Sequence, residues 1–247
     1  MSDQLPVICG VQCIHVPPVY FPVELIVQQN LLATYERLER RTIDATYNKR
    51  DRVLEGGAGI GISTLNLSWR AGFVVAYEPL SDYARIARKN LEMNNVNVEV
   101  HNAALAPKEG RVLYNRRSVV SASSGIASGY GDVVDTIEVD CVSIDAEVKK
   151  YNINCIHLDI EGSEYEILTQ MNLEPINKIT VEIHPGIIGL KNVDRMFRHL
   201  QNSGFVMAGF AGDATPDGGI LRVSNRCVLA IARPEFVDEI RTIEWAI

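Results

Sequence analysis

The residues with the clearest chemical potential form a glycine-rich turn with an acid on each side. Glu55 precedes a turn that contains Gly57, Gly59 and Gly61. Further along the chain, Glu78 ends the apolar run that begins at Phe73. Glycines allow a sharp turn and let a ligand lie against the main chain. A carboxylate at a strand end can accept hydrogen bonds from a ribose diol. The pattern therefore predicts a site for a ligand that contains a nucleoside.

A second group of reactive residues combines acids with a histidine. Asp159 and Glu161 follow the apolar run that begins at Cys155, and His184 follows the next such run. Carboxylates placed so close together are costly unless they hold a substrate, a proton, a metal or a cationic group. We expect this group to lie in the ligand-binding crevice, whereas Glu164 could simply lie in the first turn of a helix.

Alternating strands and helices must position these residues. A short strand at 53–54 precedes the glycine turn, a helix follows at 62–69, and a strand at 73–77 ends on Glu78. The remaining predicted elements are helices at 82–94 and 163–171, capped by Ser81 and Ser163, further helices at 144–150 and 193–203, and strands at 96–101, 111–114, 136–144, 155–160, 178–183, 205–210 and 226–232. Because no helix separates the last two strands, we expect an antiparallel end to the sheet. The fold class is α/β.

Two segments lie outside this alternation. Residues 1–50 combine a proline-rich arm with a helical pattern, and we expect them to cover the cofactor side or to make an oligomer contact. The charged residues around Glu39 are expected on a solvated helix face. Residues 51–247 form the main part of the domain, and the Ser- and Gly-rich stretch at 115–135 is either a surface loop or a lid over the substrate.

The motifs together resemble a known family. The turn does not fit the dinucleotide fingerprint G-x-G-x-x-G, because Ile62 or Thr64 would take the place of its third glycine. Instead VLEGGAGIGIST, AYEP, LDIEGSEYEIL and VEIHP resemble the FkbM-type methyltransferases of class I, over about residues 51–206. This resemblance implies a Rossmann-like fold with a seven-stranded, mostly parallel sheet, an antiparallel last strand and helices on both faces. It also implies S-adenosyl-L-methionine (SAM) as methyl donor, S-adenosylhomocysteine as product, and O-methylation of a hydroxyl on a sugar or natural-product small molecule.

The resemblance also implies roles for individual residues. Glu55, Gly57, Gly59 and Gly61 would contact the methionine part of SAM, Glu78 the ribose hydroxyls and Asn102 the adenine, while Asp159, Glu161 and His184 would line the acceptor pocket. The chain departs from the family pattern at Glu55, where Asp is usual, at Gly59, where Asn is usual, and at His157, in a stretch that usually carries Lys. The last departure bears on the acceptor pocket.

Methyl transfer to a hydroxyl requires a group that removes the proton. His184 is the first choice of general base because the pKa of histidine lies near working pH, and Asp159 or Glu161 is the second choice. A divalent metal held by Asp159, Glu161 and His184 is a less favoured alternative.

Composition sets further bounds. The 247 residues carry a net charge of −7, which argues against a nucleic-acid partner. No apolar run reaches the length of a membrane span, the first residues do not resemble a secretory signal, and five scattered cysteines favour a reduced, cytoplasmic protein. An NAD(P)-dependent oxidoreductase and a non-catalytic Rossmann-like binding module remain alternatives. The missing third glycine argues against the oxidoreductase, and the presence of Glu78 and of the acid cluster argues against a non-catalytic module.

Overall fold

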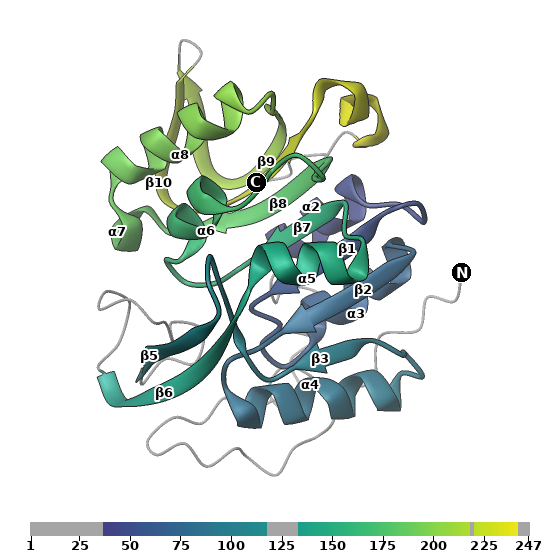
Figure 1. The fold of residues 1–247 in the computed structure, drawn as a ribbon. Helices are drawn as coiled ribbons and strands as arrows, with labels where there is room; N and C mark the ends of the chain where they lie inside the picture. Colours follow the sequence, from purple (N-terminus) through teal and green to yellow (C-terminus); the bar gives the residue numbers. More distant parts are fainter. Residues whose placement is uncertain (1–36, 118–132, 218–219, 242–247) are drawn as a thin grey trace.

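A seven-stranded sheet forms the centre of the protein in a computed structural model that describes residues 37–117, 133–217 and 220–241 (Figure 1). Its strands are β1 (Arg52–Gly56), β2 (Phe73–Tyr77), β3 (Glu99–His101), β7 (Cys155–Leu158), β8 (Lys178–Ile183), β9 (Val206–Asp217) and β10 (Ile220–Ala232). They are ordered β3-β2-β1-β7-β8-β10-β9. Neighbours from β3 to β8 are parallel, whereas β10 runs antiparallel to both β8 and β9. The predicted α/β fold with an antiparallel end is confirmed.

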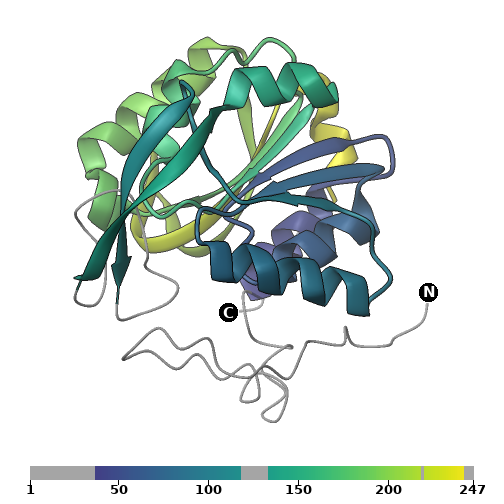
Figure 2. The same cartoon turned by 60° about the horizontal axis from the view of Figure 1, so that its bottom comes forward.

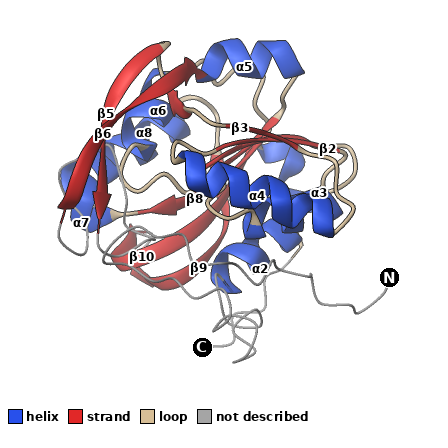
Figure 3. Cartoon of the chain, turned by 90° about the horizontal axis from the view of Figure 1, so that it is seen from below, coloured by secondary structure: helices blue, strands red, loops and turns tan. Residues whose placement is uncertain are grey.

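Helices cover both faces of this sheet (Figure 3). One face carries α2 (Arg37–Thr46), α3 (Ile62–Arg70) and α4 (Ser81–Met93), and the other carries α5 (Ile144–Tyr151), α6 (Glu164–Gln170) and α8 (Leu190–Asn202). A short helix α7 (Pro185–Ile188) follows β8, and the 3-10 helix η3 (Pro234–Glu239) follows β10. None of the helices in the described ranges combines the length and the apolar character of a membrane span.

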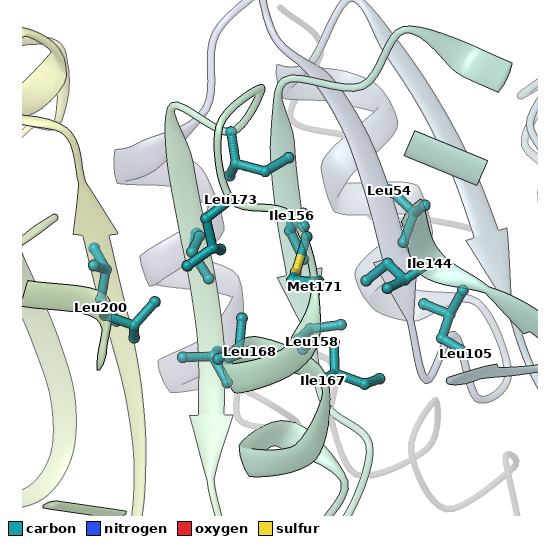
Figure 4. Close-up of a cluster of buried hydrophobic side chains, with 14 of the residues drawn as sticks. Leu54, Leu105, Ile144, Ile156, Leu158, Ile167, Leu168, Met171, Leu173 and Leu200 are labelled. Atoms are coloured by element: carbon teal, nitrogen blue, oxygen red, sulfur yellow. The ribbon is translucent and has the colours of Figure 1, made fainter. Parts of the chain in front are cut away.

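The largest hydrophobic cluster fills the space between the sheet and the second group of helices (Figure 4). Ile156 and Leu158 of β7 meet Ile167 of α6 and Ile144 of α5 there, and all four side chains are buried. Every residue of β7 and β8 is buried, as expected for parallel strands covered on both faces. The apolar runs in the sequence therefore mark the central strands correctly.

A small second sheet is inserted between β3 and α5. It consists of β4 (Ala104–Ala106), β5 (Gly110–Arg117) and β6 (Val133–Ser143), in the order β4-β6-β5. The paired strands β5 and β6 extend away from the main sheet (Figure 2). The ends of the predicted Ser- and Gly-rich stretch at 115–135 belong to these two strands. Its middle, residues 118–132, lies outside the described residues, so the lid stays a prediction.

Some local predictions were wrong. Ser81 is the first residue of α4 rather than its cap, because Leu80 takes the N-cap position. Ser163 does occupy the N-cap position of α6, but its hydroxyl makes no capping hydrogen bond. Glu39 does not lie on a solvated face, since its side chain is buried against His157 of β7. Most of the predicted N-terminal arm, residues 1–36, lies outside the described residues.

A buried polar network anchors α2 to the sheet. The Tyr47 hydroxyl donates to the main-chain oxygen of Ile156 at 2.6 Å and lies 2.6 Å from the Thr180 hydroxyl. Thr180 is 2.7 Å from His157 Nδ1, and His157 Nε2 is 2.7 Å from Glu39 Oε1. Because Tyr47 donates its only hydrogen to Ile156, Thr180 must donate to Tyr47 and accept from the histidine. His157 and Glu39 therefore share the remaining proton between them.

Candidate active site

The parallel strands at the centre of the sheet end side by side. In the register of the sheet, Gly56 of β1 lies between Tyr77 of β2 and Leu158 of β7, and Leu158 lies opposite Val181 of β8. The residues that follow these positions reach one edge of the sheet, the carboxyl edge at which open α/β sheets bind ligands. These residues are Gly57, Glu78, Asp159 and Glu182.

The glycine turn has a tightly packed part and an open part. Gly57 has a φ of 86°, and a Cβ atom there would lie 1.8 Å from the main-chain oxygen of Asp159. At Gly61, with a φ of 90°, a Cβ atom would lie 3.0 Å from Cα of Ala87 in α4. Gly59 faces open space. A pocket opens at this turn, and it is lined by Glu39, Gly57, Ala58, Gly59, Ile60, Ile62, Ser63 and Asp159.

Glu55 connects β1 to the helix that follows the turn. Its side chain is fully buried, and its Oε2 atom accepts a hydrogen bond of 2.6 Å from the Thr64 hydroxyl. This hydrogen bond fixes the start of α3 relative to β1 and therefore stabilises the glycine turn between them. The contact of Glu55 with the methionine part of a cofactor stays a prediction.

Glu78 lies at the end of β2 with both carboxylate oxygens bonded to the main chain. Oε2 accepts from the N–H of Gly59 and Oε1 from the N–H of Leu80, each at 2.8 Å. Burial raises the pKa of Glu78 to about 8, outweighing the opposite effect of these two hydrogen bonds. The Asn102 amide donates to the main-chain oxygens of Glu78 and Pro79 at 3.0 and 2.8 Å. Asn102 thus holds the turn after β2, and its contact with adenine stays a prediction.

His184 lies among four carboxylates. Its Nε2 atom is 3.3 Å from Glu161 Oε2 and 3.8 Å from Asp159 Oδ1. The same atom is 3.7 Å from Glu182 Oε1, while Nδ1 is 2.8 Å from Glu164 Oε1. The structure therefore brings together the three predicted acceptor-pocket residues and adds two further acids.

Glu164 fixes the orientation of the histidine ring. The side chain of Glu164 is fully buried, and its Oε1 atom also accepts a hydrogen bond of 3.0 Å from the N–H of Gly162. With Nδ1 donating to Glu164, Nε2 faces the other acids. Burial by itself lowers the pKa of His184, but the hydrogen bond to Glu164 and the charges of Glu164, Glu161 and Asp159 outweigh it and raise the pKa to about 9. At neutral pH and without another cation, both ring nitrogens carry protons.

The turn after β7 is strained at Glu161. This residue has a φ of 49°, in the left-handed region that non-glycine residues rarely adopt, and Gly162 follows with a φ of 111°. Such a conformation costs about 1–3 kcal/mol and persists where the surroundings enforce it. The turn places the Glu161 carboxylate next to His184.

Sequence reasoning missed the roles of Glu182 and Glu164. Glu182 and His184 are two positions apart at the end of β8, a spacing that places side chains on the same face of a strand. The presence of the charged residue Glu182 in a mainly apolar strand sequence could therefore have indicated its role. No such signal marks Glu164. Glu166 lies in the same first turn of α6 but is exposed, and nothing in the sequence distinguishes these two acids.

The inserted sheet meets the main sheet at the end of β1. Burial raises the pKa of Tyr114 well above its usual value, and the negative charges of Glu78 and Glu161 raise it further. Leu105 of β4 lies beside Gly56 at the end of β1, where an added Cβ atom would lie 2.8 Å from Leu105 Cδ1. The second sheet therefore borders the same edge of the main sheet.

The comparison with known families decides the class of the protein. A family model described as the methyltransferase FkbM domain matches residues 55–207. The chain belongs to the FkbM methyltransferase family. The matched residues include the glycine turn, Glu78 and the His184 cluster, and the family assignment makes the protein a SAM-dependent methyltransferase. A search of curated proteins found no match.

Solved structures similar to this FkbM-family chain are distant in sequence. A methyltransferase FkbM from Methylobacillus flagellatus is 16% identical with a TM-score of 0.49, and the match covers 80% of this chain and 50% of that one. A precorrin-6y C5,15-methyltransferase from Geobacter metallireducens is 13% identical with a TM-score of 0.47, covering 82% and 91%. A SAM-dependent O-methyltransferase from Thermotoga maritima is 14% identical with a TM-score of 0.42, covering 78% and 63%.

The residues of this FkbM-family chain fit SAM. The open main chain at Gly59 and the pocket beside it suit the methionine part, and the buried carboxylate of Glu78 lies within the same turn. SAM carries no phosphates, which agrees with a turn that lacks the third glycine of the dinucleotide fingerprint. The family match and this fit favour methyl transfer over the two alternatives that the sequence left open.

Proposed function

We propose that this methyltransferase transfers the methyl group of SAM to a hydroxyl of a sugar or natural-product small molecule. The observation that carries the proposal is the His184 cluster, which gathers four carboxylates at the ends of β7 and β8, directly beside the glycine turn. A group of acids suits a hydroxyl acceptor, since carboxylates accept hydrogen bonds from hydroxyls and can take the proton that the reaction releases.

When bound, SAM supplies a methyl group on a positively charged sulfur, and transfer to a hydroxyl oxygen yields the methyl ether, S-adenosylhomocysteine and one proton. The chain must orient the acceptor and accept this proton. His184 is a poor acceptor of protons in this geometry, because its Nδ1 atom donates to Glu164 and its Nε2 atom faces the carboxylates of Asp159 and Glu161. We therefore assign the role of general base to the Asp159 and Glu161 pair, with His184 as the positioning residue.

The test combines cofactor binding with turnover. Calorimetric titration with S-adenosylhomocysteine comes first, followed by reaction of methyl-labelled SAM with a panel of sugars and hydroxylated natural products and with their amino analogues. We expect binding of S-adenosylhomocysteine and methylation of a hydroxyl. The Asp159→Asn and Glu161→Gln variants should lose at least ~10²-fold in turnover, with cofactor affinity retained.

The exposed Glu166→Gln variant serves as the control because Glu166 lies on α6 outside the cluster. Methylation of the amino analogues alone would overturn the O-methyltransferase proposal. Full turnover of both Asp159→Asn and Glu161→Gln would remove these carboxylates from the role of base.

A further inference from the structure

The distances around His184 Nε2 suit a bound cation better than direct hydrogen bonds. The contacts to Glu161, Asp159 and Glu182 measure 3.3, 3.8 and 3.7 Å. Hydrogen bonds between nitrogen and oxygen are usually 2.7–3.2 Å. A cation with ligands at about 2.0–2.3 Å holds neighbouring ligand atoms roughly 3–4.5 Å apart. One ligand atom each from Asp159, Glu182 and His184 lies within 4.8 Å of the others.

The negative charge of the four carboxylates also favours a bound cation. Glu164 and Glu182 are almost fully buried, and Asp159 and Glu161 are largely buried. His184 can offset at most one of these four negative charges. Burying several carboxylates together is unfavourable unless further positive charge compensates them.

Buried oxygen atoms without hydrogen bonds supply an independent observation. Asp159 Oδ1 and Glu164 Oε2 are both buried, and neither has a hydrogen-bond partner in the described part of the chain. The Glu164 side chain has no exposed surface, and its other oxygen is bonded to His184. Buried polar atoms without partners are rare in native proteins, and a bound ion is one of the partners that can satisfy them.

The hydrogen bond from His184 Nδ1 to Glu164 completes the pattern of a metal centre. A histidine that binds a metal through one ring nitrogen generally donates its other N–H to a carboxylate or a main-chain oxygen. Here Glu164 is that carboxylate, and it leaves Nε2 facing Asp159 and Glu182.

We propose that Asp159, Glu182 and His184 bind one divalent cation of the Mn²⁺ type, with Glu164 holding the histidine ring in place. Carboxylate oxygens suit Mg²⁺ and Mn²⁺, and the imidazole nitrogen shifts the preference towards Mn²⁺. Three protein ligands leave open positions on such an ion, which prefers octahedral coordination.

The cation has a role in the reaction that rests on the proposed function. An acceptor hydroxyl at an open position loses its proton more readily, because a bound cation lowers the pKa of an attached oxygen. As the acceptor oxygen bonds to the methyl carbon, the carbon–sulfur bond breaks with its electron pair on sulfur. The hydroxyl proton passes to Glu161, the member of the Asp159 and Glu161 pair that does not bind the cation. Acceptors with two adjacent oxygens are the favoured class, since both oxygens can occupy neighbouring positions.

Binding of Mn²⁺ itself provides the test, without SAM or acceptor. The full chain is treated with EDTA, freed of it and titrated with MnCl₂, while the loss of the free-ion signal is followed by electron paramagnetic resonance. We expect one Mn²⁺ per chain and at least ~10-fold weaker binding in Glu182→Gln and His184→Ala, with a loss of ~10–100-fold in Glu164→Gln. The exposed Glu166→Gln variant should bind like the wild type. Far-ultraviolet circular dichroism checks that each variant is folded.

The outcomes separate this inference from the proposed function. A folded wild-type chain that binds S-adenosylhomocysteine but not Mn²⁺ overturns the cation site and leaves methyl transfer standing. Binding of Mn²⁺ that Glu166→Gln weakens as much as Glu182→Gln also overturns the site. A chain that binds Mn²⁺ with the expected variant pattern but not S-adenosylhomocysteine retains the site and contradicts the proposed function.

Discussion

At the scale of single residues, Glu78 makes the stability of the glycine turn depend on pH. Its carboxylate has a pKa of about 8 in the folded chain because it is buried, against an ordinary value of 4.5. Between these pH values the folded state holds a proton that the unfolded state has released. Glu78 therefore stabilises the folded state at low pH, and this contribution to the unfolding free energy is lost as the pH rises through about 8.

The Glu78→Gln variant removes this titration. Relative to the variant, we expect the wild type without cofactor to lose a few kcal/mol of unfolding free energy between pH 5 and pH 8, at about 1.4 kcal/mol per pKa unit. Denaturant unfolding of both proteins across this range measures the difference, and the exposed Glu109→Gln variant is the control. Wild-type and Glu78→Gln stabilities that change in parallel with pH would contradict the prediction.

Among the glycines of the turn, Gly57 is the one at which an added methyl group should destabilise the fold most. The Gly57→Ala side chain would collide with the main-chain oxygen of Asp159 while also adopting a φ of 86°. We expect a loss of at least ~2 kcal/mol in unfolding free energy and at least ~10-fold weaker binding of S-adenosylhomocysteine. Gly189→Ala is the matched control, because Gly189 has a φ of 79° with open space around it. Equal losses in the two variants would show that strain, not collision, governs this turn.

At the scale of elements, a buried lysine joins three parts of the chain. Lys178 at the start of β8 has no exposed side-chain surface, and its Nζ atom lies 2.9 Å from Asp51 and 2.8 Å from Glu239 of η3. Burial by itself lowers the pKa of Lys178, but the hydrogen bonds to these two carboxylates outweigh it and raise the pKa. The lysine thus remains charged and holds η3 and the start of β1 against β8.

Replacement of this lysine should leave an uncompensated buried acid. We expect Lys178→Met to lower the unfolding free energy by about 3–5 kcal/mol, since Asp51 would remain buried without its partner. Lys150→Met removes the ion pair of an exposed lysine with Glu147, which keeps its hydrogen bond from the Tyr77 hydroxyl, and should cost ~1 kcal/mol or less. Urea unfolding measures both. A Lys178→Met variant as stable as Lys150→Met would contradict the prediction.

The sequence predicted the elements better than the contacts between them. Apolar runs and glycine turns locate β1, β2, β7 and β8, because buried parallel strands have a composition that differs from that of their surroundings. Tertiary packing decided what the patterns did not contain. The charged face of α2 turned out to bury Glu39 because His157 offers it a hydrogen bond. Likewise, which of Glu164 and Glu166 faces His184 depends on the rotation of α6, which the sequence does not specify.

At the scale of the whole molecule, α2 connects the face of the sheet that it covers to the pocket beside the glycine turn. Glu39 lines the pocket beside the glycine turn and also bonds His157 within the sheet. A ligand that fills this pocket should therefore stabilise α2 along with the turn, because binding opposes local opening of the elements that contact the ligand.

Hydrogen exchange measures this coupling. On saturation with S-adenosylhomocysteine, we expect main-chain amides of residues 37–46 and of the glycine turn to exchange at least ~10-fold more slowly. Amides of α8 serve as the internal reference, since this helix covers the opposite face of the sheet. Slower exchange in the turn alone would show that ligand binding at the turn does not stabilise α2.

The insertion of β4, β5 and β6 between β3 and α5 bears on how the family can diversify. The His184 cluster and the glycine turn follow the ends of strands whose register is set by the main sheet, whereas the second sheet borders the end of β1 through Leu105 of β4. Natural selection can therefore lengthen, shorten or rewrite the insertion while the chemistry at the strand ends is inherited unchanged. Related enzymes that methylate different acceptors are expected to diverge first in the segment between β3 and α5.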